Sequence, residues 1–557
     1  MTTHNPTVLP FLDDGEGEGQ EVQSRRIPII GFFASIGNNV NAMVGSGIFS
    51  TPGVVWRLTA SSGATFWLFL MGAVISMCGS LIYAEASIGP YVKETFWEKA
   101  YLEKAFPEPR RLLSYLFSIA MITIIRPGAI VAVSNIVAQY FLFATLGIKN
   151  SEESDYHPTY FTDWKFWRLR LISVLAVLIA TTYHIYSNTI AHRINQTVSI
   201  VKLLILTAVT IMGIMVLSRN TSNWDGAFET TQPENNKVTA SDYGSAIFFV
   251  LFCYEGWNNI NYQLDEVRNV RKNLVRTGVL SVAALLLLQL DLLVIVSYVS
   301  VVPRSYILNG HSFGQNETLA SSTTSNPNEV IVTLFATFFK NASTNVMIDG
   351  TIPLYELIQA DNSHDKLARA FSVCVVVSSF GAMTALIWSG VRVIVASAQS
   401  DYIPRVSGLL KQRHEARRTY TNAFVAQLLW CTVIIILAPT TDPFSFLVSL
   451  SQYTILIAYG AASIGLLHLR HTEPNLKRPF IPKPIVYFFL FMIALILIVP
   501  FTKDPSELPY VISLCVIGLA VSAWYWKYYA LSQRPPSLEP ASSISVEPST
   551  SSFEIQG

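Results

Sequence analysis

The sequence predicts an all-α protein that crosses a lipid bilayer many times, and three observations support this fold class. Hydrophobic residues make up 51% of the 557 residues, charged residues only 13%, and the mean hydropathy is +0.40. A soluble protein of this size carries about a quarter charged residues. Apolar runs of about 20 residues, long enough to span a membrane as helices, recur along the chain. The sequence therefore favours a polytopic membrane protein, and it has no basic tract that would bind nucleic acid.

Twelve apolar segments are predicted as transmembrane helices. They cover residues 28–56, 64–90, 112–146, 169–188, 196–218, 243–266, 277–302, 367–398, 422–438, 443–467, 484–501 and 508–530. These spans form two halves, with spans one to five at 28–218 and spans six to ten at 243–467, followed by spans eleven and twelve at 468–531. An extracellular loop at 219–242 separates the halves, and the second half includes a long extracellular loop at 303–366. Tails at 1–27 and 532–557 flank the spans. Both tails are rich in Ser, Pro, Glu and Gly, a composition typical of disorder.

The distribution of Lys and Arg predicts the orientation of these spans. With the N-terminus inside the cell, most of the Lys and Arg residues near the membrane fall in cytoplasmic segments, as the positive-inside rule requires. The sequons at Asn220, Asn316 and Asn341 then face outward, where glycosylation takes place. We therefore expect a multi-pass glycoprotein of the plasma membrane with both termini in the cytoplasm.

Neither a cofactor nor an enzyme active site is predicted. The five cysteines all fall inside apolar runs, which argues against a disulfide framework and against a zinc site. A membrane-embedded enzyme would need a catalytic cluster within its spans. The candidates His184 and His192 lie near the inner end of a helix without companion carboxylates.

Two predicted spans are interrupted near their middle. The first contains Gly45-Ser46-Gly47, and the sixth contains Glu255-Gly256-Trp257-Asn258-Asn259. Unwound backbone at membrane depth is tolerated only beside a cavity or packed protein. Because the two breaks open the two halves at corresponding positions, they indicate a transporter of inverted-repeat design with its substrate at mid-membrane. The alternative is that the glycines are only points of close helix packing.

The exposed backbone at these breaks suits a zwitterion. The N–H groups of Ser46 and Gly47 begin a half-helix, whose positive end attracts a carboxylate. Carbonyl groups freed at Met43, and near Phe252 and Glu255, accept hydrogen bonds from an ammonium group. An α-amino acid carries both charges on one carbon, so a small patch of unwound backbone holds both.

These residues belong to a series of motifs that resembles a known family. The series comprises "GSGIFSTPG" (45–53), "YAEASIGP" (83–90), "IIRPGAIVAV" (124–133), "VKLLIL" (201–206), "YEGWNNINYQLDEVRNVRKNL" (254–274), "SYVSVVP" (297–303), "SSFGAMTALIWSGVRVIVASAQSDYIP" (378–404) and "LAPTTDPFSFLVSLSQY" (437–453). In this order they resemble the L-type amino acid transporters of the amino acid–polyamine–organocation superfamily, most closely the fungal high-affinity methionine permease branch. The implied fold has twelve helices and a leucine-transporter-like 5+5 inverted repeat in which helices one and six are broken.

The resemblance implies a function and roles for individual residues. It implies sodium-independent import of neutral L-amino acids, methionine first among them, by proton symport; an exchanger of the L-type and a non-transporting amino acid sensor are the alternatives. The resemblance implies that the substrate carboxylate binds at Gly45, Ser46 and Gly47. It implies that the amino group binds at Met43, Phe252 and Glu255, with Gly256 and Asn258 beside them. Ser134 and Thr384 are candidates for the side-chain pocket. Phe252 resembles an aromatic gate, and Trp257 and Asn259 support the sixth-helix break.

Two charged residues are assigned to coupling. Lys202 lies near the middle of a span, where a lysine costs about 3 kcal/mol unless it is paired or solvated. In the resembling proteins this lysine occupies the place where sodium binds in relatives. The alternative is that Lys202 is an interfacial lysine that snorkels to the membrane surface. Glu255 departs from the family's small residue and is either a proton carrier, a partner of the substrate ammonium, or a cap for the second half-helix. Arg126, before Pro127, is interpreted as structural, with a part in gating as the alternative.

Two further departures from the family bear on gating and on partners. The family's "SGG" after the second span is replaced by "YVKETFWEKAYLEKAF" (91–106), which transfers the inner gate to other residues. Animal L-type transporters are linked to a single-pass partner through a cysteine between helices three and four. The corresponding loop here, 149–165, has no cysteine, so no disulfide-linked partner is expected there.

Overall fold

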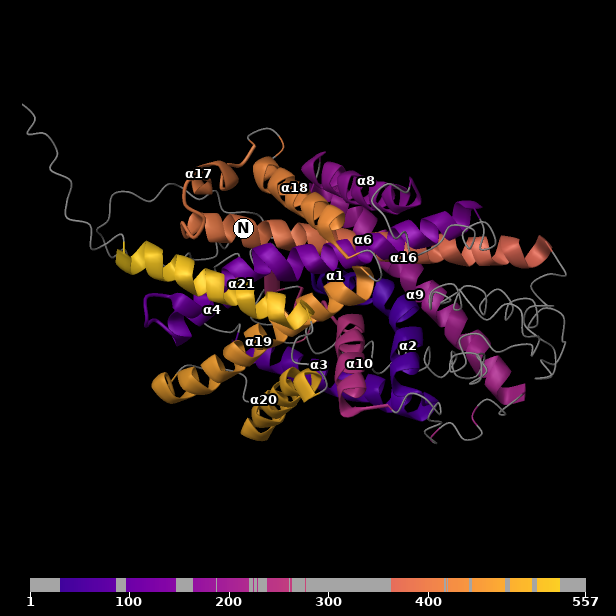
Figure 1. Ribbon diagram of the computed structural model, residues 1–557, viewed down its shortest axis with the longest axis horizontal. Coiled ribbons are helices and arrows are strands. Elements are labelled where there is room, and N and C mark those ends of the chain that lie inside the picture. The colour runs from indigo at the N-terminus through magenta and orange to yellow at the C-terminus, as the bar shows by residue number, and fades with distance from the viewer. Residues whose placement is uncertain are drawn as a thin grey trace, which may run out of the picture.

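The computed structural model describes residues 31–86, 97–146, 164–186, 188–219, 238–259, 362–414, 419–439, 443–475, 481–502 and 508–530, apart from a few positions within and between these ranges. Every regular element in these ranges is a helix (Figure 1). Six of the described helical segments are long and apolar enough to cross a membrane, and three shorter helices are also apolar. The predicted all-α class is confirmed, while the count of twelve spans and the inverted repeat remain predictions.

The helices follow the predicted spans closely. Their bounds are α1 Phe32–Met43, α2 Ser46–Thr59, α3 Ser62–Ala86, α4 Trp97–Ala105, α5 Leu112–Ala120, η2 Met121–Ile125, α6 Arg126–Leu146, α8 Trp164–Tyr186, α9 Asn188–Arg219, α10 Ala240–Cys253, α16 Asn362–Gln399, α17 Ser407–Leu410, α18 Thr421–Leu437, α19 Pro443–Thr472, α20 Lys483–Ile498, η5 Val499–Thr502, α21 Leu508–Tyr525 and η6 Trp526–Ala530. Predicted span seven, 277–302, lies outside the described residues, as does the part of span six beyond residue 262.

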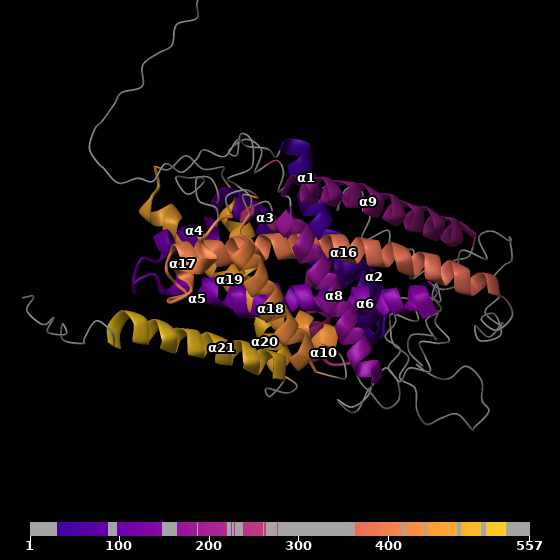
Figure 2. The same cartoon turned by 90° about the horizontal axis from the view of Figure 1, so that it is seen from above.

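Long helices run along the longest axis of the molecule. In Figures 1 and 2, α16 and α6 lie side by side across the middle, where they make the most extensive contact between two elements. α8 and α18 pack on one another beside this pair, and α21 runs along one edge, against α5 and α19. α10 packs against α2, α3 and α19. α1 packs against α9 and α16, and α2 packs against α3 and α10.

The predicted break in the first span is present at residues 44–45. α1 ends at Met43, where the N–H of Val44 donates to the carbonyl of Val40 at 2.8 Å, and α2 begins at Ser46. Gly45 lies between them in an extended conformation, with φ −132° and ψ −148°. The chain therefore leaves one helix and enters the next without continuing the ladder of hydrogen bonds between turns.

The sixth span is also interrupted where the sequence predicts. α10 ends at Cys253 and residues 254–258 form turns. Gly256 has φ +116°, a conformation that is open to glycine and strained for any residue with a Cβ atom. The glycine of the "YEGWNN" motif is thus required by the backbone of the turn.

A wide helical turn lies in the predicted third span. The π-helical turn η2 precedes Pro127, whose ring nitrogen has no hydrogen to donate to the carbonyl of Thr123. The indole nitrogen of Trp430, on α18, donates to that carbonyl at 3.0 Å instead. The carbonyl group left without a donor by this proline is therefore satisfied by a side chain from a neighbouring helix.

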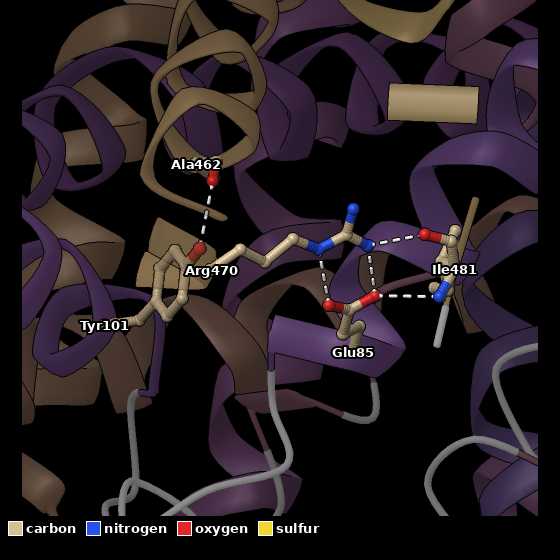
Figure 3. Close-up of polar contacts among 5 residues, drawn as sticks. All are labelled: Glu85, Tyr101, Ala462, Arg470 and Ile481. Atoms are coloured by element: carbon tan, nitrogen blue, oxygen red, sulfur yellow. Dashed lines mark hydrogen bonds and ion pairs between the residues drawn. The ribbon is translucent and has the colours of Figure 1, made fainter. Parts of the chain in front are cut away.

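Helix α4 lies outside the twelve predicted spans. α4 occupies residues 97–105, within the segment that replaces the family's "SGG". It packs against α19, where the Tyr101 hydroxyl donates to the carbonyl of Ala462 at 3.2 Å (Figure 3). Gly465, one turn further along α19, lets the two helices approach, since a Cβ there would lie 3.1 Å from the Cβ of Ala105.

Candidate functional site

The two helix breaks lie directly against one another. A Cβ atom added to Gly256 would lie 2.6 Å from the Cβ of Ala42 and 3.0 Å from the backbone nitrogen of Met43. The Asn39 side-chain amide donates to the carbonyl of Trp257 at 2.9 Å and ties the end of α1 to the turn after α10. Residues more than 200 positions apart in sequence are thereby joined at one place.

Glycines also bring the start of α2 close to two other helices. A Cβ on Gly47 would lie 2.9 Å from the Cα of Cys253 in α10, and a Cβ on Gly45 would lie 2.7 Å from the Cβ of Ala382 in α16. One turn into α2, the hydroxyl of Thr51 contacts the thiol of Cys253. The close-packing role of these glycines and the break in the helix therefore occur together.

The N-terminus of α2 is available to an anion. Gly45, the residue before the helix, has no side chain to cap it, and the first turn of a helix carries N–H groups without helical acceptors. The Ser46 hydroxyl is buried and has no hydrogen-bond partner in the described part of the chain. Together with the positive end of the helix dipole, these donors suit a carboxylate.

Lys202 supports the end of α1. Its side chain is fully buried, and its ammonium group donates to the carbonyl of Asn41 at 2.9 Å. In a continuous helix that carbonyl would accept from residue 45, so the lysine replaces a bond lost at the break. The Asn41 amide in turn donates to the carbonyl of Gly381 in α16 at 3.1 Å. The ammonium group thus stays inside the protein and does not reach the surface as a snorkelling lysine would.

Glu255 lies in a polar network on the other side of the breaks. Its carboxylate accepts from the Tyr459 hydroxyl at 3.3 and 3.4 Å. The Asn258 amide donates to the hydroxyls of Tyr459, at 3.2 Å, and Tyr262, at 3.4 Å. The Asn258 carbonyl oxygen and the Asn259 amide are buried without partners among the described residues. Buried polar atoms left unpaired cost about 1–3 kcal/mol each, a cost that a polar ligand would remove.

Aromatic rings surround the turn after α10. The Trp257 ring packs against Tyr83, with centroids 4.9 Å apart, and against Tyr459, at 5.3 Å. The Phe252 ring meets Phe444 at 5.8 Å. The Phe252 carbonyl already accepts the N–H of Glu255 at 3.2 Å, so it offers a ligand the remaining acceptor capacity of its oxygen.

The two residues assigned to the side-chain pocket have other contacts. The Ser134 hydroxyl donates to the carbonyl of Val131 within α6 at 2.8 Å. The Thr384 hydroxyl contacts the carbonyl of Gly381 at 2.7 Å and the side-chain oxygen of Asn195 in α9 at 2.8 Å. Both hydroxyls are thus engaged by helices rather than by the two breaks. The sequons Asn220, Asn316 and Asn341 lie outside the described residues.

The burial of Glu98 was not predicted from the sequence. Glu98 of α4 lies between predicted spans in a segment with alternating charges, so nothing in its local sequence signals burial, yet it is only 1% exposed. Burial raises the pKa of the Glu98 carboxyl from 4.5 to about 7, against the opposing effects of Tyr262 and Arg126. Arg126 itself is 2% exposed and lies over the Tyr262 ring, with its guanidinium carbon 4.6 Å from the centroid.

The groups that meet at the two breaks can bind a small molecule that carries both charges. Among the described residues, no group of three or more His, Cys, Asp and Glu side chains is placed to hold a metal ion. All five cysteines are free thiols. What converges is an uncapped helix end, carbonyl groups at a second helix end and a carboxylate, the complement of a molecule with one negative and one positive group.

Comparisons with known proteins show the family of the chain. The family model described as amino acid permease matches residues 30–522. The chain is 23% identical over 498 residues to the b(0,+)-type amino acid transporter 1 of Mus musculus, covering 88% of this chain and 86% of the relative. It is 23% identical over 521 residues to the high-affinity methionine permease of Saccharomyces cerevisiae, covering 90% and 78%. It is 24% identical over 500 residues to the large neutral amino acids transporter small subunit 2 of Mus musculus, covering 88% and 78%.

Proposed function

This chain belongs to the amino acid permease family, and from that premise we propose that it imports neutral L-amino acids, with methionine as the leading substrate. It is an integral membrane protein and an amino acid transporter of the amino acid–polyamine–organocation superfamily. The similar proteins described above are transporters, and none is an enzyme by name.

The contact between the two helix breaks carries the proposal. Gly256 lies against Ala42 and Met43, so the carbonyl end of α1, the amino end of α2 and the turn after α10 share one small volume. The substrate carboxylate binds at Gly45, Ser46 and Gly47, at the positive end of α2.

The substrate amino group binds on the opposite side of the same volume. Backbone carbonyls at Met43 and Phe252 accept from it, and the Glu255 carboxylate supplies a charge-assisted bond. Gly256 and Asn258 complete the wall there, and Trp257 and Asn259 hold the turn in shape. Phe252 acts as the aromatic gate.

Independence of sodium is supported by Lys202. Its buried side-chain nitrogen donates to a carbonyl at the end of α1, in the place that the resemblance assigns to a sodium ion in related proteins. The similarity to a yeast methionine permease supports methionine as a substrate and import as the direction. The similarity to the large neutral amino acids transporter small subunit 2 supports the second candidate, a sodium-independent exchanger.

The cellular setting follows from the same proposal. The protein lies in the plasma membrane with both termini in the cytoplasm, and it works without a disulfide-linked partner subunit. A sensor that binds an amino acid without moving it is the remaining alternative, and measured flux would eliminate it.

Transport by purified protein in lipid vesicles tests the proposal. Uptake of labelled methionine is measured into vesicles that are empty or preloaded with unlabelled methionine, with and without an inward proton gradient, and with sodium replaced by choline. A symporter accumulates methionine in empty vesicles only with the gradient, whereas an exchanger needs the preloaded substrate. Equal uptake with sodium and choline is expected, and no flux in any condition would contradict transport.

A matched pair of serine variants tests the position of the substrate. Ser46 and Ser62 are both buried and both have hydroxyls without partners in the described structure, but only Ser46 lies at the break. Ser46→Ala removes a donor worth roughly 1 kcal/mol and should raise KM about fivefold. Ser62→Ala should leave KM unchanged. An equal effect of the two substitutions would contradict the assigned carboxylate site.

A further inference from the structure

A group of buried ionisable side chains lies beside the turn after α10. Its six members come from five parts of the chain: Tyr83 of α3, Glu98 of α4, Arg126 of α6, Glu255 and Tyr262 after α10, and Tyr459 of α19. We call these six residues the Glu98 cluster. None of them is more than 9% exposed to solvent. Their charges must therefore be balanced within the protein, because water does not reach them.

The charges within the Glu98 cluster do not balance when all its acids are ionised. Arg126 interacts electrostatically with both Glu98 and Glu255 and is the one cation among the six. Two carboxylates and one guanidinium leave a net charge of about −1, which is costly to bury. Two carboxyl groups that share a site resist ionising together. One bound proton makes the cluster neutral.

The hydrogen bonds distinguish the two carboxyl groups. Glu255 accepts from the Tyr459 hydroxyl, whereas Glu98 makes no hydrogen bond of normal geometry among the described residues, and the Tyr262 and Tyr83 hydroxyls only partly offset the effect of its burial. Two nitrogens of Arg126, Nε and Nη2, are also unpaired there. An ionised carboxylate needs several donors, while a protonated one needs fewer and donates itself. Glu98 is therefore the carboxyl group that binds the proton when Glu255 is ionised.

The packing of α4 on α19 brings Glu98 to this position. Glu98 and Tyr101 are three residues apart and lie on one face of α4. Tyr101 bonds to Ala462 of α19 (Figure 3), while Glu98 interacts with Tyr459, three residues before Ala462 on the same helix. Glu98 and Tyr101 of α4 therefore lie opposite Tyr459 and Ala462 of α19. The uncharged hydrogen bond between Tyr101 and Ala462 holds Glu98 in place.

The other charged residues of α4 are engaged elsewhere. The Lys99 ammonium lies 3.5 Å from the Glu103 carboxylate and 5.6 Å from the centre of the Tyr402 ring. Lys104 pairs with Glu473 at 3.1 Å. The contacts given for these two lysines lie outside the Glu98 cluster, and Arg126 is the cation within it. The pKa of Glu98, raised by burial to about 7, agrees with a group that takes up and releases a proton near neutral pH.

We propose that Glu98 and Glu255 share one exchangeable proton across Arg126, and that this carboxyl pair is the proton-binding site of the transporter. A proton from water converts one carboxylate to a carboxylic acid, and its release restores the carboxylate. The link to amino acid movement rests on the proposed function. When a substrate ammonium lies beside Glu255, that carboxyl ionises and the proton resides on Glu98. With a zwitterion bound, the charges of Glu98, Glu255 and Arg126 sum to zero only when the proton is also present.

Infrared spectroscopy tests the proton itself, independently of transport. The purified protein should show the carbonyl stretch of a buried, protonated carboxylic acid, which declines as the pH rises through about 7. Glu98→Gln should remove this pH-dependent band, and Glu473→Gln, at the partly exposed partner of Lys104, should leave it intact. A wild-type protein without the band, or a band unchanged by Glu98→Gln and by Glu255→Gln, would overturn the shared proton.

Transport by the same Glu98→Gln protein tests the coupling. One coupled proton supports about tenfold accumulation of substrate per pH unit of gradient. Glu98→Gln should bring this accumulation ratio to about one, while exchange of labelled for unlabelled substrate continues. Glu98→Asp, which keeps the carboxyl group, should restore part of the gradient-driven accumulation. Normal accumulation by Glu98→Gln would overturn the coupling role.

The two measurements separate this inference from the proposed function. Suppose that wild-type protein shows the pH-dependent band, exchanges substrate and does not respond to a proton gradient. This result would support the shared proton but contradict both proton symport and the coupling role. Gradient-driven accumulation without the band would support symport and overturn the carboxyl pair as its proton-binding site.

Discussion

The guanidinium group of Arg470 and the carboxylate of Glu85 form a two-point ion pair at the ends of α19 and α3. The Arg470 Nε donates to Glu85 at 2.8 Å, and a terminal nitrogen donates to the second carboxylate oxygen (Figure 3). The same carboxylate accepts the N–H of Ile481 at 3.1 Å, and the Ile481 carbonyl accepts from Arg470 at 2.7 Å. Three segments of the chain are therefore joined at one ion pair that is largely buried.

Glu85→Gln is expected to destabilise the protein substantially. Removing one partner of a buried ion pair leaves the other charge uncompensated and costs roughly 3 kcal/mol. The thermal unfolding temperature of the purified protein measures the effect. Lys104→Ala is the control, because it breaks the more exposed pair with Glu473, and such pairs contribute about 0–1 kcal/mol. Similar unfolding temperatures for both variants would argue against the structural importance of the Glu85–Arg470 pair.

Gly256→Ala is expected to abolish uptake. The added Cβ would lie 2.6 Å from Ala42 in a backbone conformation with positive φ, so the two helix breaks would be forced apart. Uptake of labelled methionine and the amount of protein at the cell surface are measured together. Gly518→Ala in α21 is the matched control, since its Cβ would meet nothing within 4 Å and alanine favours a helix. A transporter with normal uptake after Gly256→Ala would refute the close contact between the breaks.

Lys202→Met is expected to weaken the end of α1. The substitution keeps an unbranched side chain that is one atom shorter, and it leaves the buried Asn41 carbonyl without its ammonium donor, at a cost of about 1–3 kcal/mol. Both the unfolding temperature and sodium-independent uptake should fall. Lys527→Met, near the end of α21, provides a comparison at a lysine that lies outside the breaks. Unchanged stability and uptake in Lys202→Met would show that the lysine does not support the break.

Glu98→Gln is expected to change how stability depends on pH. Because burial raises the pKa of Glu98 from 4.5 to about 7, the folded protein holds a proton between these values that the unfolded chain has lost. The contribution of this group is therefore complete below about pH 4.5 and declines as the pH rises towards and through 7. Unfolding temperatures at pH 5 and pH 8 should differ less in Glu98→Gln than in the wild type. An equal difference in both proteins would contradict the raised pKa.

The helix break at residues 44–45 and the turn at Gly256 were predictable because glycines interrupt long apolar runs there, and the structure has them where the sequence predicts. Glu98 was not predictable, since its segment has the alternating charges of an exposed loop. Its burial depends on Tyr101, which bonds to α19 more than 350 residues away in sequence. Ser134 and Thr384 were assigned to the side-chain pocket from resemblance. The Ser134 hydroxyl bonds within its own helix and the Thr384 hydroxyl contacts Asn195 of α9, so their place in the pocket stays a prediction.

The sequence by itself determined that this protein is helical, that it belongs in a membrane, and that two of its predicted spans are interrupted. Apolar run length and glycine placement are local properties, and the cost of unpaired backbone groups in lipid turns them into structural requirements. The tertiary structure alone decided which groups meet at the breaks. The ammonium of Lys202, the amide of Asn39 and the carboxyl groups of Glu98 and Glu255 come together through helix packing, because long-range contacts are set by the shapes of whole helices and not by the residues adjacent in sequence.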